Sequence, residues 1–242
     1  MSGLYLNPKK CHFYQMEIDF LGHHIYSRGI EANSSKVNKI LKWLVPKSTT
    51  NVRSFLGLVW YISIYLPNLA GHTCVLTPLT TKAAKTDFPV WTNEHQHVFQ
   101  AIKDFVTSRE CLTVIDHINP GENKIFVMCD ASDWCTGGVL SFRPTWETVR
   151  PVVFNSLQLN AAEQNYPVHE KELLAIVHAI KKWCSDLLGS RITVYTNHYT
   201  FKNFSTQKDL SHRQLCWQEL MLWLLPQDFP TWVPRSCDPD QT

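Results

Sequence analysis

Three residues of this chain have the side-chain types and the contexts needed to hold a divalent metal ion. Asp130 ends the apolar run 125–129, Glu172 lies near the start of a long amphipathic segment, and Asn197 ends the β-branched run 191–196. Adjacent dications that activate a water need several anionic oxygens around them. An amide oxygen can coordinate a cation but carries no charge. A site built from these residues would therefore lack one negative charge.

The residues can act together only if the surrounding elements bring them to one place. The turn sequence Asn119-Pro120-Gly121 introduces this part of the chain. Periodicity and helix-end signals then predict strands at 125–129, 137–140 and 151–154, a helix at 170–188, a strand at 192–195 and a helix at 211–222. The predicted order is β-β-β-α-β-α.

This order predicts a mixed sheet. Three strands with short connections favour an antiparallel meander, and the strand after the long helix should lie parallel to the first through a right-handed crossover. Asp130 and Asn197 then end adjacent parallel strands at the same edge of the sheet. Open α/β sheets place their sites at the carboxyl ends of strands. We therefore expect the three residues to converge there.

The first part of the chain predicts a small, mostly helical unit. Residues 12–26 alternate in polarity like extended strands, with Gly22 permitting a turn. Ser34 or Ser35 is expected to cap a first helix and Thr49 or Thr50 a second, and a third should begin at Thr92 or Asn93; prolines 46 and 67 stop the first two.

Composition excludes several classes of protein. With 242 residues, 44% of them hydrophobic and 18% charged, the chain can bury a core and is not a disordered polypeptide. The longest apolar stretch, at 55–66, is too short to span a bilayer, and we expect no membrane partner. The eight cysteines lack a Cys-x-x-Cys pair, which indicates reduced thiols inside the cell, in cytoplasm or nucleus, rather than disulfides or a zinc site.

The net charge of +2 hides an asymmetry. Residues 1–86 hold ten Lys or Arg against three Asp or Glu, a net of +7, while residues 87–242 hold thirteen against eighteen, a net of −5. A basic part joined to an acidic one suits a nucleic-acid-handling module beside a metal-dependent site. Uneven surface charge without a function is the alternative interpretation.

Several motifs, in order, make the chain recognisable. LNPKKCHF at 6–13, FLGH at 20–23, RSFLGL at 53–58 and PN at 67–68 resemble the end of the palm and the thumb of a reverse transcriptase from a gypsy-type LTR retrotransposon. PL at 78–79 and FPVWT at 88–92 resemble the connection that follows. CDAS at 129–132, GGVL at 137–140, YPVHEKELLAI at 166–176 and VYTNH at 194–198 resemble the ribonuclease H (RNase H) domain of the same polyprotein. The resemblance covers nearly the whole chain.

The resemblance implies a division into three parts. Residues 1–86 are expected to be the palm-end and thumb-like segment, residues 87–222 the connection and RNase H-like domain, and residues 223–242 an irregular, proline-rich tail. The implied fold class is α/β, an RNase H-like mixed sheet preceded by the helical subdomain. Because prolines 226, 230, 234 and 239 crowd the tail, we expect the last strand and helix of the family fold to be missing.

The resemblance also implies a reaction, the cleavage of the RNA strand of an RNA–DNA hybrid by two Mg²⁺ ions held by four carboxylates. By resemblance Asp130 is the first carboxylate and Glu172 the second, with Glu170 as the alternative, and the family has an aspartate where this chain has Asn197. Asp130, Glu172 and Asn197 are thus the predicted catalytic and metal-binding residues, and Mg²⁺ binding is expected to be weak or lost. The catalytic aspartates of the polymerase are expected upstream of residue 1.

Three functions follow as hypotheses. The chain is a decayed fragment of a retroelement polyprotein, a residual ribonuclease H, or a co-opted module that binds hybrid or duplex through its basic part. In the last case the predicted phosphate contacts are Lys36, Lys39, Lys42, Lys47 and Arg53. The expected partners are an RNA–DNA hybrid or other nucleic acid and the rest of a retroelement polyprotein.

Overall fold

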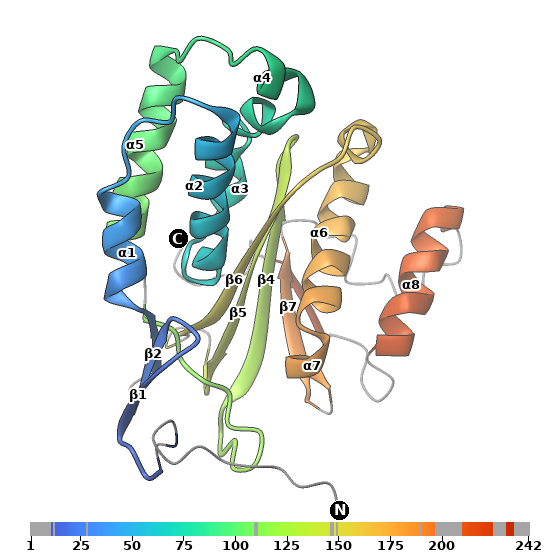
Figure 1. The fold of residues 1–242 in the computed structure, drawn as a ribbon. Helices are drawn as coiled ribbons and strands as arrows, with labels where there is room; N and C mark the ends of the chain where they lie inside the picture. The colour runs from blue at the N-terminus through green and yellow to red at the C-terminus, as the bar shows by residue number, and fades with distance from the viewer. Residues whose placement is uncertain are drawn as a thin grey trace, which may run out of the picture.

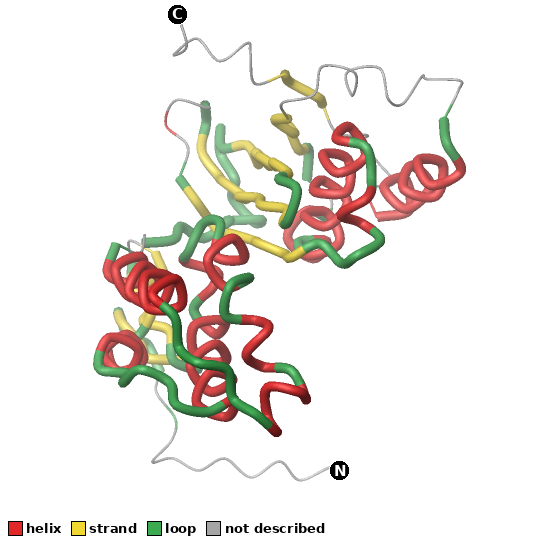
Figure 2. The backbone as a smooth tube through the Cα atoms, turned by 90° about the horizontal axis from the view of Figure 1, so that it is seen from above, coloured by secondary structure: helices red, strands yellow, loops and turns green. Residues whose placement is uncertain are grey.

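The computed structural model describes residues 11–234 except 12, 28, 109–110, 146–147, 149, 189, 197–209 and 225–230. The helices and strands form two units, one after the other along the chain. The first is mainly helical, and the second is built on a mixed sheet (Figure 1). Seen from above, the two units lie against each other, with the helical unit on one side of the sheet (Figure 2). None of the helices in the described ranges is long and apolar enough to cross a membrane.

The helical unit begins with a small antiparallel sheet of β1 (Glu17–Phe20), β2 (His23–Tyr26) and β3 (Gly29–Ala32). Its helices are α1 (Ser34–Leu41), α2 (Thr49–Tyr61), η2 (Ser63–Tyr65), α3 (Leu69–Thr73), η3 (Thr77–Thr80), α4 (Lys82–Thr86) and α5 (Asn93–Thr107). The predicted helices are therefore present, but Asn33 and Ser48 are the side-chain caps of the first two, each accepting from a backbone N–H of the first turn. Thr92 caps α5 in a capping box with His95.

One hydrophobic core joins these helices. Phe55, Tyr65, Phe99 and Ile102 are fully or almost fully buried in it. The core extends to Leu112, so α5 packs with the helices before it. Leu112 also closes the unit through its backbone, because it exchanges hydrogen bonds of 2.8 and 3.0 Å with Ile30 of β3.

The second unit is a five-stranded mixed sheet. Its elements are β4 (Lys124–Ala131), β5 (Cys135–Arg143), β6 (Pro151–Gln158), η5 (Glu163–Asn165), α6 (Val168–Lys182), α7 (Cys184–Leu187), β7 (Ile192–Thr196), α8 (His212–Leu224) and β8 (Thr231–Pro234). The strand order is β6-β5-β4-β7-β8, with β6 to β4 antiparallel and β7 parallel to both β4 and β8. The predicted meander and the predicted parallel pairing are both confirmed.

The tail differs from the prediction. We expected an irregular segment and no last strand, but Thr231–Pro234 pairs in parallel with β7 as the outermost strand of the sheet. The prediction excluded a central strand on the basis of proline density. An edge strand tolerates proline, because its outer N–H groups need no partner within the sheet.

The two faces of the sheet are covered by different layers. Helix α6 covers one face, where Val127, Leu140 and Val194 pack against Ile176 and Trp183, and α8 packs beside α6 (Figure 1). The helical unit covers the β5–β6 part of the other face, where Phe154 joins its core and Ser156 Oγ accepts a 2.8 Å hydrogen bond from the backbone N–H of Ala70. The sheet is thus held from both sides (Figure 1).

Gly29 provides a test of how the helical unit closes. It has φ +144°, and a Cβ at this position would lie 2.0 Å from the carbonyl oxygen of Leu112. Gly29→Ala should therefore lower the free energy of unfolding by about 2–4 kcal/mol, because the backbone must move and strain is added. Gly57→Ala is the matched control, since its Cβ would meet nothing within 4 Å inside α2 and should stabilise by about 0.5–1 kcal/mol. Urea unfolding of the three proteins gives the comparison; equal effects of the two substitutions would contradict this account of the closure.

Candidate active site

The carboxyl ends of two parallel strands define the candidate site. Met128 of β4 is paired with Tyr195 of β7, so the two strands run side by side to the same edge of the sheet. Asp130 is the second-last residue of β4 and is exposed, and one of its carboxylate oxygens accepts from the backbone N–H of Ala131 at 3.1 Å. The described part of β7 ends at Thr196. Asn197, the next residue and a predicted ligand, lies outside the described residues.

The start of α6 is attached to the same edge. The ammonium group of Lys171 lies 2.8 Å from the carboxylate of Asp133, which belongs to the turn between β4 and β5. The Lys171 side chain is 8% exposed and that of Asp133 is 77% exposed, so the ion pair joins a buried helix residue to a surface turn. Glu172, the next residue along α6, is buried. The ion pair therefore holds the turn of α6 that carries Glu172 beside the tip of β4.

The two glutamates of α6 have different environments. The carboxylate of Glu170 is buried, forms an ion pair with Arg213 of α8 and accepts a 3.1 Å hydrogen bond from Ser211 Oγ. The Arg213 guanidinium also lies 3.7 Å from the centre of the Tyr166 ring. Glu170 thus fastens α8 to α6. This assignment favours Glu172 over Glu170 as the glutamate of the site.

Asp130 and Glu172 approach from different faces of the sheet. Asp130 is paired with Gly137, whose added Cβ would lie 2.8 Å from Asn68 Oδ1 of the helical unit. The next pair, Cys129 with Gly138, faces the opposite way, because a Cβ on Gly138 would lie 3.2 Å from the Trp183 ring next to α6. The two carboxylates can therefore meet only around the tip of β4.

A small cavity accompanies Asp130. It has a volume of about 120 Å³ and is bounded by Pro67 and Asn68 of the helical unit as well as by Asp130, Gly137 and Phe154. Asn68 has a left-handed backbone, with φ 51°, which turns the chain toward the sheet at this point. In the sequence, Asn68 is notable only as part of the PN motif at 67–68. Nothing in that motif indicates that Asn68 lies next to Asp130.

The donors present fit part of a magnesium site. Asp130 and Glu172 offer the hard carboxylate oxygens that Mg²⁺ prefers. However, no group of three or more His, Cys, Asp or Glu is arranged for a metal within the described ranges of the chain. Asn197, the third predicted ligand, lies outside those ranges.

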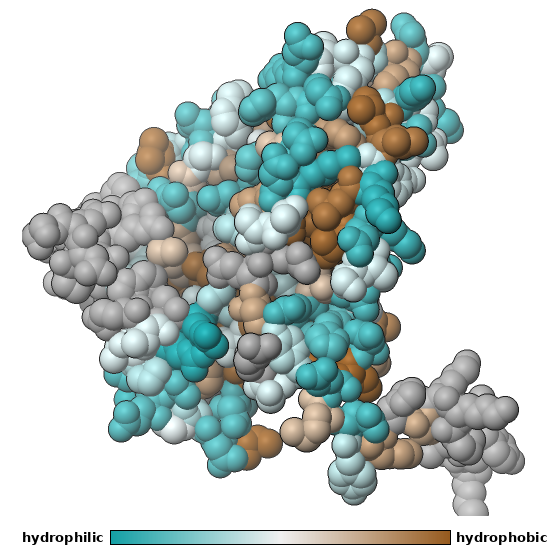
Figure 3. Space-filling model, turned by 90° about the vertical axis from the view of Figure 1, so that its left-hand side faces the viewer, coloured by the Kyte–Doolittle hydropathy of each residue, from teal (hydrophilic) through white to brown (hydrophobic). Residues whose placement is uncertain are grey.

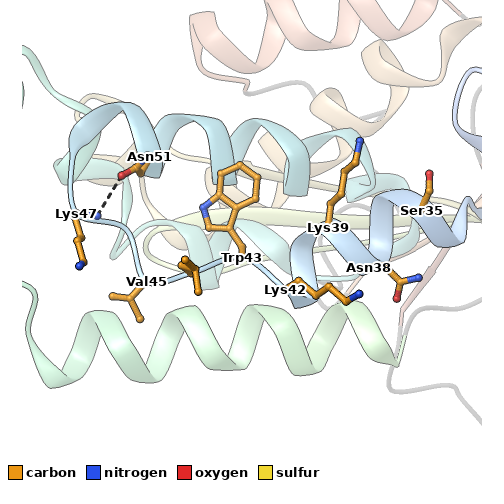
Figure 4. A pocket seen from close by; sticks show the side chains of 9 residues that line it. Ser35, Asn38, Lys39, Lys42, Trp43, Val45, Lys47 and Asn51 are labelled. Carbon is orange, nitrogen blue, oxygen red and sulfur yellow. Dashed lines mark hydrogen bonds between the residues drawn. The ribbon is translucent and has the colours of Figure 1, made fainter.

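The predicted phosphate contacts fall into two sets. Lys39, Lys42 and Lys47 are exposed and line one groove of about 680 Å³, which we call the lysine groove, together with Trp43 and Asn51 (Figure 4). Figure 4 shows Lys39 and Lys42 on one side of Trp43 and Lys47 on the other. The outward face of this unit is largely hydrophilic, with hydrophobic side chains in separate patches (Figure 3).

The other two cations already have partners inside the unit. Arg53 donates from Nε to the carbonyl oxygen of Thr80 at 3.0 Å, and a second guanidinium nitrogen donates to the same oxygen. The ammonium group of Lys36 lies 4.9 Å from the centre of the Tyr61 ring. Arg53 therefore tethers α2 to η3, a structural role that the sequence prediction did not include.

Comparison with known proteins agrees with this architecture. Residues 121–223 match the family described as the RNase H-like domain found in reverse transcriptase. The transposon Tf2-3 and Tf2-4 polyproteins of Schizosaccharomyces pombe are each 32% identical over 182 residues, which is 75% of this chain and 13% of the polyprotein. The chain thus spans about an eighth of the length of these relatives.

Solved structures share the fold. A foamy viral protease-reverse transcriptase in complex with an RNA/DNA hybrid superposes with a TM-score of 0.73 at 22% identity, covering 96% of this chain and 31% of that one. The same kind of protein in complex with double-stranded DNA gives 0.70 at 21% identity, covering 90% and 44%. With its RNase H-like domain, the chain belongs to the reverse transcriptase and RNase H region of LTR retrotransposon polyproteins. The resemblance inferred from the motifs is confirmed.

Glu170 and Glu172 should respond differently to substitution. Glu170→Gln removes the charge that pairs with the half-exposed Arg213 and should lower the free energy of unfolding by about 1–2 kcal/mol, between the values for surface and buried pairs. It should leave any stabilisation by Mg²⁺ unchanged. Glu172→Gln, the matched control on the same helix, should abolish that stabilisation. Thermal melts with and without Mg²⁺, in an Asn197→Asp background, test this; the opposite pattern would reassign the two glutamates.

Proposed function

We propose that this region descends from an RNase H that hydrolyses the RNA strand of RNA–DNA hybrids, and that Asn197 has reduced this activity. The parallel tips of β4 and β7, with the start of α6 held beside them by Lys171, support the proposal. The foamy viral protein of similar fold was solved with an RNA/DNA hybrid bound. Hydrolysis during reverse transcription is the role this origin implies.

Each residue would have a distinct task. Divalent metal ions, when bound, would activate the attacking water and stabilise the leaving oxygen. Asp130 would supply a carboxylate from the tip of β4, and Glu172 a second one from α6. Lys171 would position Glu172 by fixing its helical turn to Asp133. Asn197 would present an uncharged amide oxygen, so the cluster would hold one negative charge fewer.

The missing charge sets the expected size of the loss. Removing one preorganised electrostatic contact from a site of this kind costs roughly 3–4 kcal/mol. Since about 1.4 kcal/mol corresponds to a tenfold change in rate, hydrolysis should be slower by about 10²–10³-fold than in a chain with aspartate at this position.

Restoring the charge tests the proposal. Asn197→Asp should raise Mg²⁺-dependent cleavage of a labelled RNA–DNA hybrid by about 10²–10³-fold. Asp130→Asn in the same background should remove the gain, because it deletes the first carboxylate. A Mg²⁺ titration of cleavage, with circular dichroism to confirm folding, gives the measurement. An unchanged rate in Asn197→Asp would contradict the assignment of this position.

A second candidate function is nucleic-acid binding without hydrolysis. It is favoured by the lysine groove, whose lining contains three exposed lysines and no carboxylate. Such a groove can neutralise phosphates and release counterions. This function would persist in a chain whose hydrolysis is lost, and the remainder of the polyprotein would not be needed for it.

Binding through the lysine groove has a salt signature. Replacing Lys39, Lys42 and Lys47 by Gln should weaken binding to a hybrid and lower the slope of log K against log [salt] by up to about 2.7, at roughly 0.9 per phosphate contact. Lys82→Gln with Lys85→Gln serves as a control, since both lysines are exposed on α4, outside the groove. Fluorescence anisotropy over a range of KCl concentrations measures the slope. An identical slope in the variant and the wild type would exclude the groove as a phosphate site.

A further inference from the structure

A second groove lies between the two units, on the β6 side of the sheet. It has a volume of about 520 Å³ and takes residues from α2 and η2 on one side, from α6 on the other, and from β6 between them. In Figure 1, α2 and α6 stand on opposite sides of the sheet. We call this cavity the inter-unit groove. Asp130 is absent from its lining.

The inter-unit groove follows the open edge of the sheet. β6 is the outermost strand on this side, and four of its consecutive residues, 154–157, contribute to the lining. Ser156 points toward the helical unit, where its hydroxyl accepts from Ala70. Because side chains alternate along a strand, Asn155 and Leu157 point toward α6. The groove is therefore bounded by both covering layers and by the strand edge.

One wall of the groove is cationic. Lys181 and Lys182, in the last turn of α6, are exposed, and neither has an ion pair within the described part of the chain. The lining contains no carboxylate. The dipole of α6 accounts for cations at its C-terminus. The helix dipole does not account for the aromatic side chain that the helical unit places in the same groove, Trp60 of α2.

His178 completes this wall as a neutral side chain. Its Nδ1 lies 3.2 Å from Thr136 Oγ1 of β5. Burial lowers the pKa of His178; the nearby Glu163 carboxylate opposes this and the Lys181 ammonium adds to it. Glu163 itself accepts from the backbone N–H of Asn160 at 2.8 Å. The positive charge of the groove at neutral pH thus comes from the two lysines.

The opposite wall is aromatic and accessible. Trp60, the second-last residue of α2, is 40% exposed; Leu157 of β6, on the α6 side of the strand, is 43% exposed. An exposed indole beside cations is the combination that binds single-stranded nucleic acids, where bases stack on aromatic rings and the backbone follows positive charge. A volume of 520 Å³ is in the range of small-ligand sites, about 300–1,000 Å³, which suits a short length of one strand and is too small for a duplex.

We propose that the inter-unit groove binds a single-stranded segment of RNA or DNA, with Lys181 and Lys182 contacting phosphates and Trp60 stacking on a base. This proposal goes beyond the hydrolytic function, because it uses none of the residues at the tip of β4. The strand would lie across the junction of the two units. Binding would then link the helical unit to the RNase H-like domain.

The experiment measures binding of short fluorescein-labelled single-stranded RNA and DNA by anisotropy, in EDTA and in an Asp130→Asn background so that hydrolysis plays no part. Lys181→Gln with Lys182→Gln should lower the slope of log K against log [salt] by about 1.4, at roughly 0.7 per phosphate of a single strand. Trp60→Ala should weaken binding about 5–150-fold and leave this slope unchanged. Trp60→Phe, which keeps a ring, should restore most of the affinity.

A matched control separates the effect of Lys181 and Lys182 from the general effect of removing two positive charges. Lys82→Gln with Lys85→Gln removes the same charge from α4 and should change the slope by much less. Equal slopes for the two double variants, or unchanged affinity in Trp60→Ala, would overturn the proposal. A loss for RNA alone or DNA alone would identify which strand the groove takes. Hybrid cleavage by the same variants in the Asn197→Asp background is scored separately, so a failure of either proposal leaves the other distinguishable.

Discussion

The parallel pairing of β4 with β7 is the constraint on which the candidate site depends. A parallel pair cannot be closed by a hairpin, so the chain must cross the sheet between the two strands, and α6 makes that crossing. The crossover returns the second strand in the same direction as the first and brings both carboxyl ends to one edge. The core residues of α6 bury this arrangement against Val127 and Val194. The position of Asp130 and the direction in which β7 runs to Thr196 follow from it.

Two charged residues at the start of α6 each connect this helix to a different neighbouring element. Lys171 binds the turn after β4, and Glu170 binds Arg213 of α8. Both side chains are buried, and a buried charge without a partner would be strongly destabilising. These two ion pairs fix the first turn of α6, immediately before Glu172. A site that needs a carboxylate in a defined place is thus supported by neighbours that carry out no chemistry.

Much of this arrangement could be predicted from the sequence, because it depends on local signals. The apolar run before Asp130, the helical spacing through Ile176 and the turn at Gly121 each predict an element, and their order predicts the sheet. What could not be predicted depends on contacts between distant residues. Nothing local to Arg53 indicates that its guanidinium meets Thr80, and nothing local to Asn68 indicates that it reaches Gly137. Proline density in the tail could not predict the edge strand at 231–234, because proline disfavours a central strand but is tolerated in an edge strand.

Contacts between the two units join them, which the charge pattern of the sequence does not indicate. The Pro67-Asn68 turn sits against the β4–β5 pair at Gly137, and Ala70 is bonded to Ser156 of β6. The helical unit is therefore one wall of the Asp130 cavity and one wall of the inter-unit groove. None of these contacts involves position 197, so a change of charge there does not remove them. If both proposals hold, the capacity to bind nucleic acid would therefore outlast the capacity to cut it.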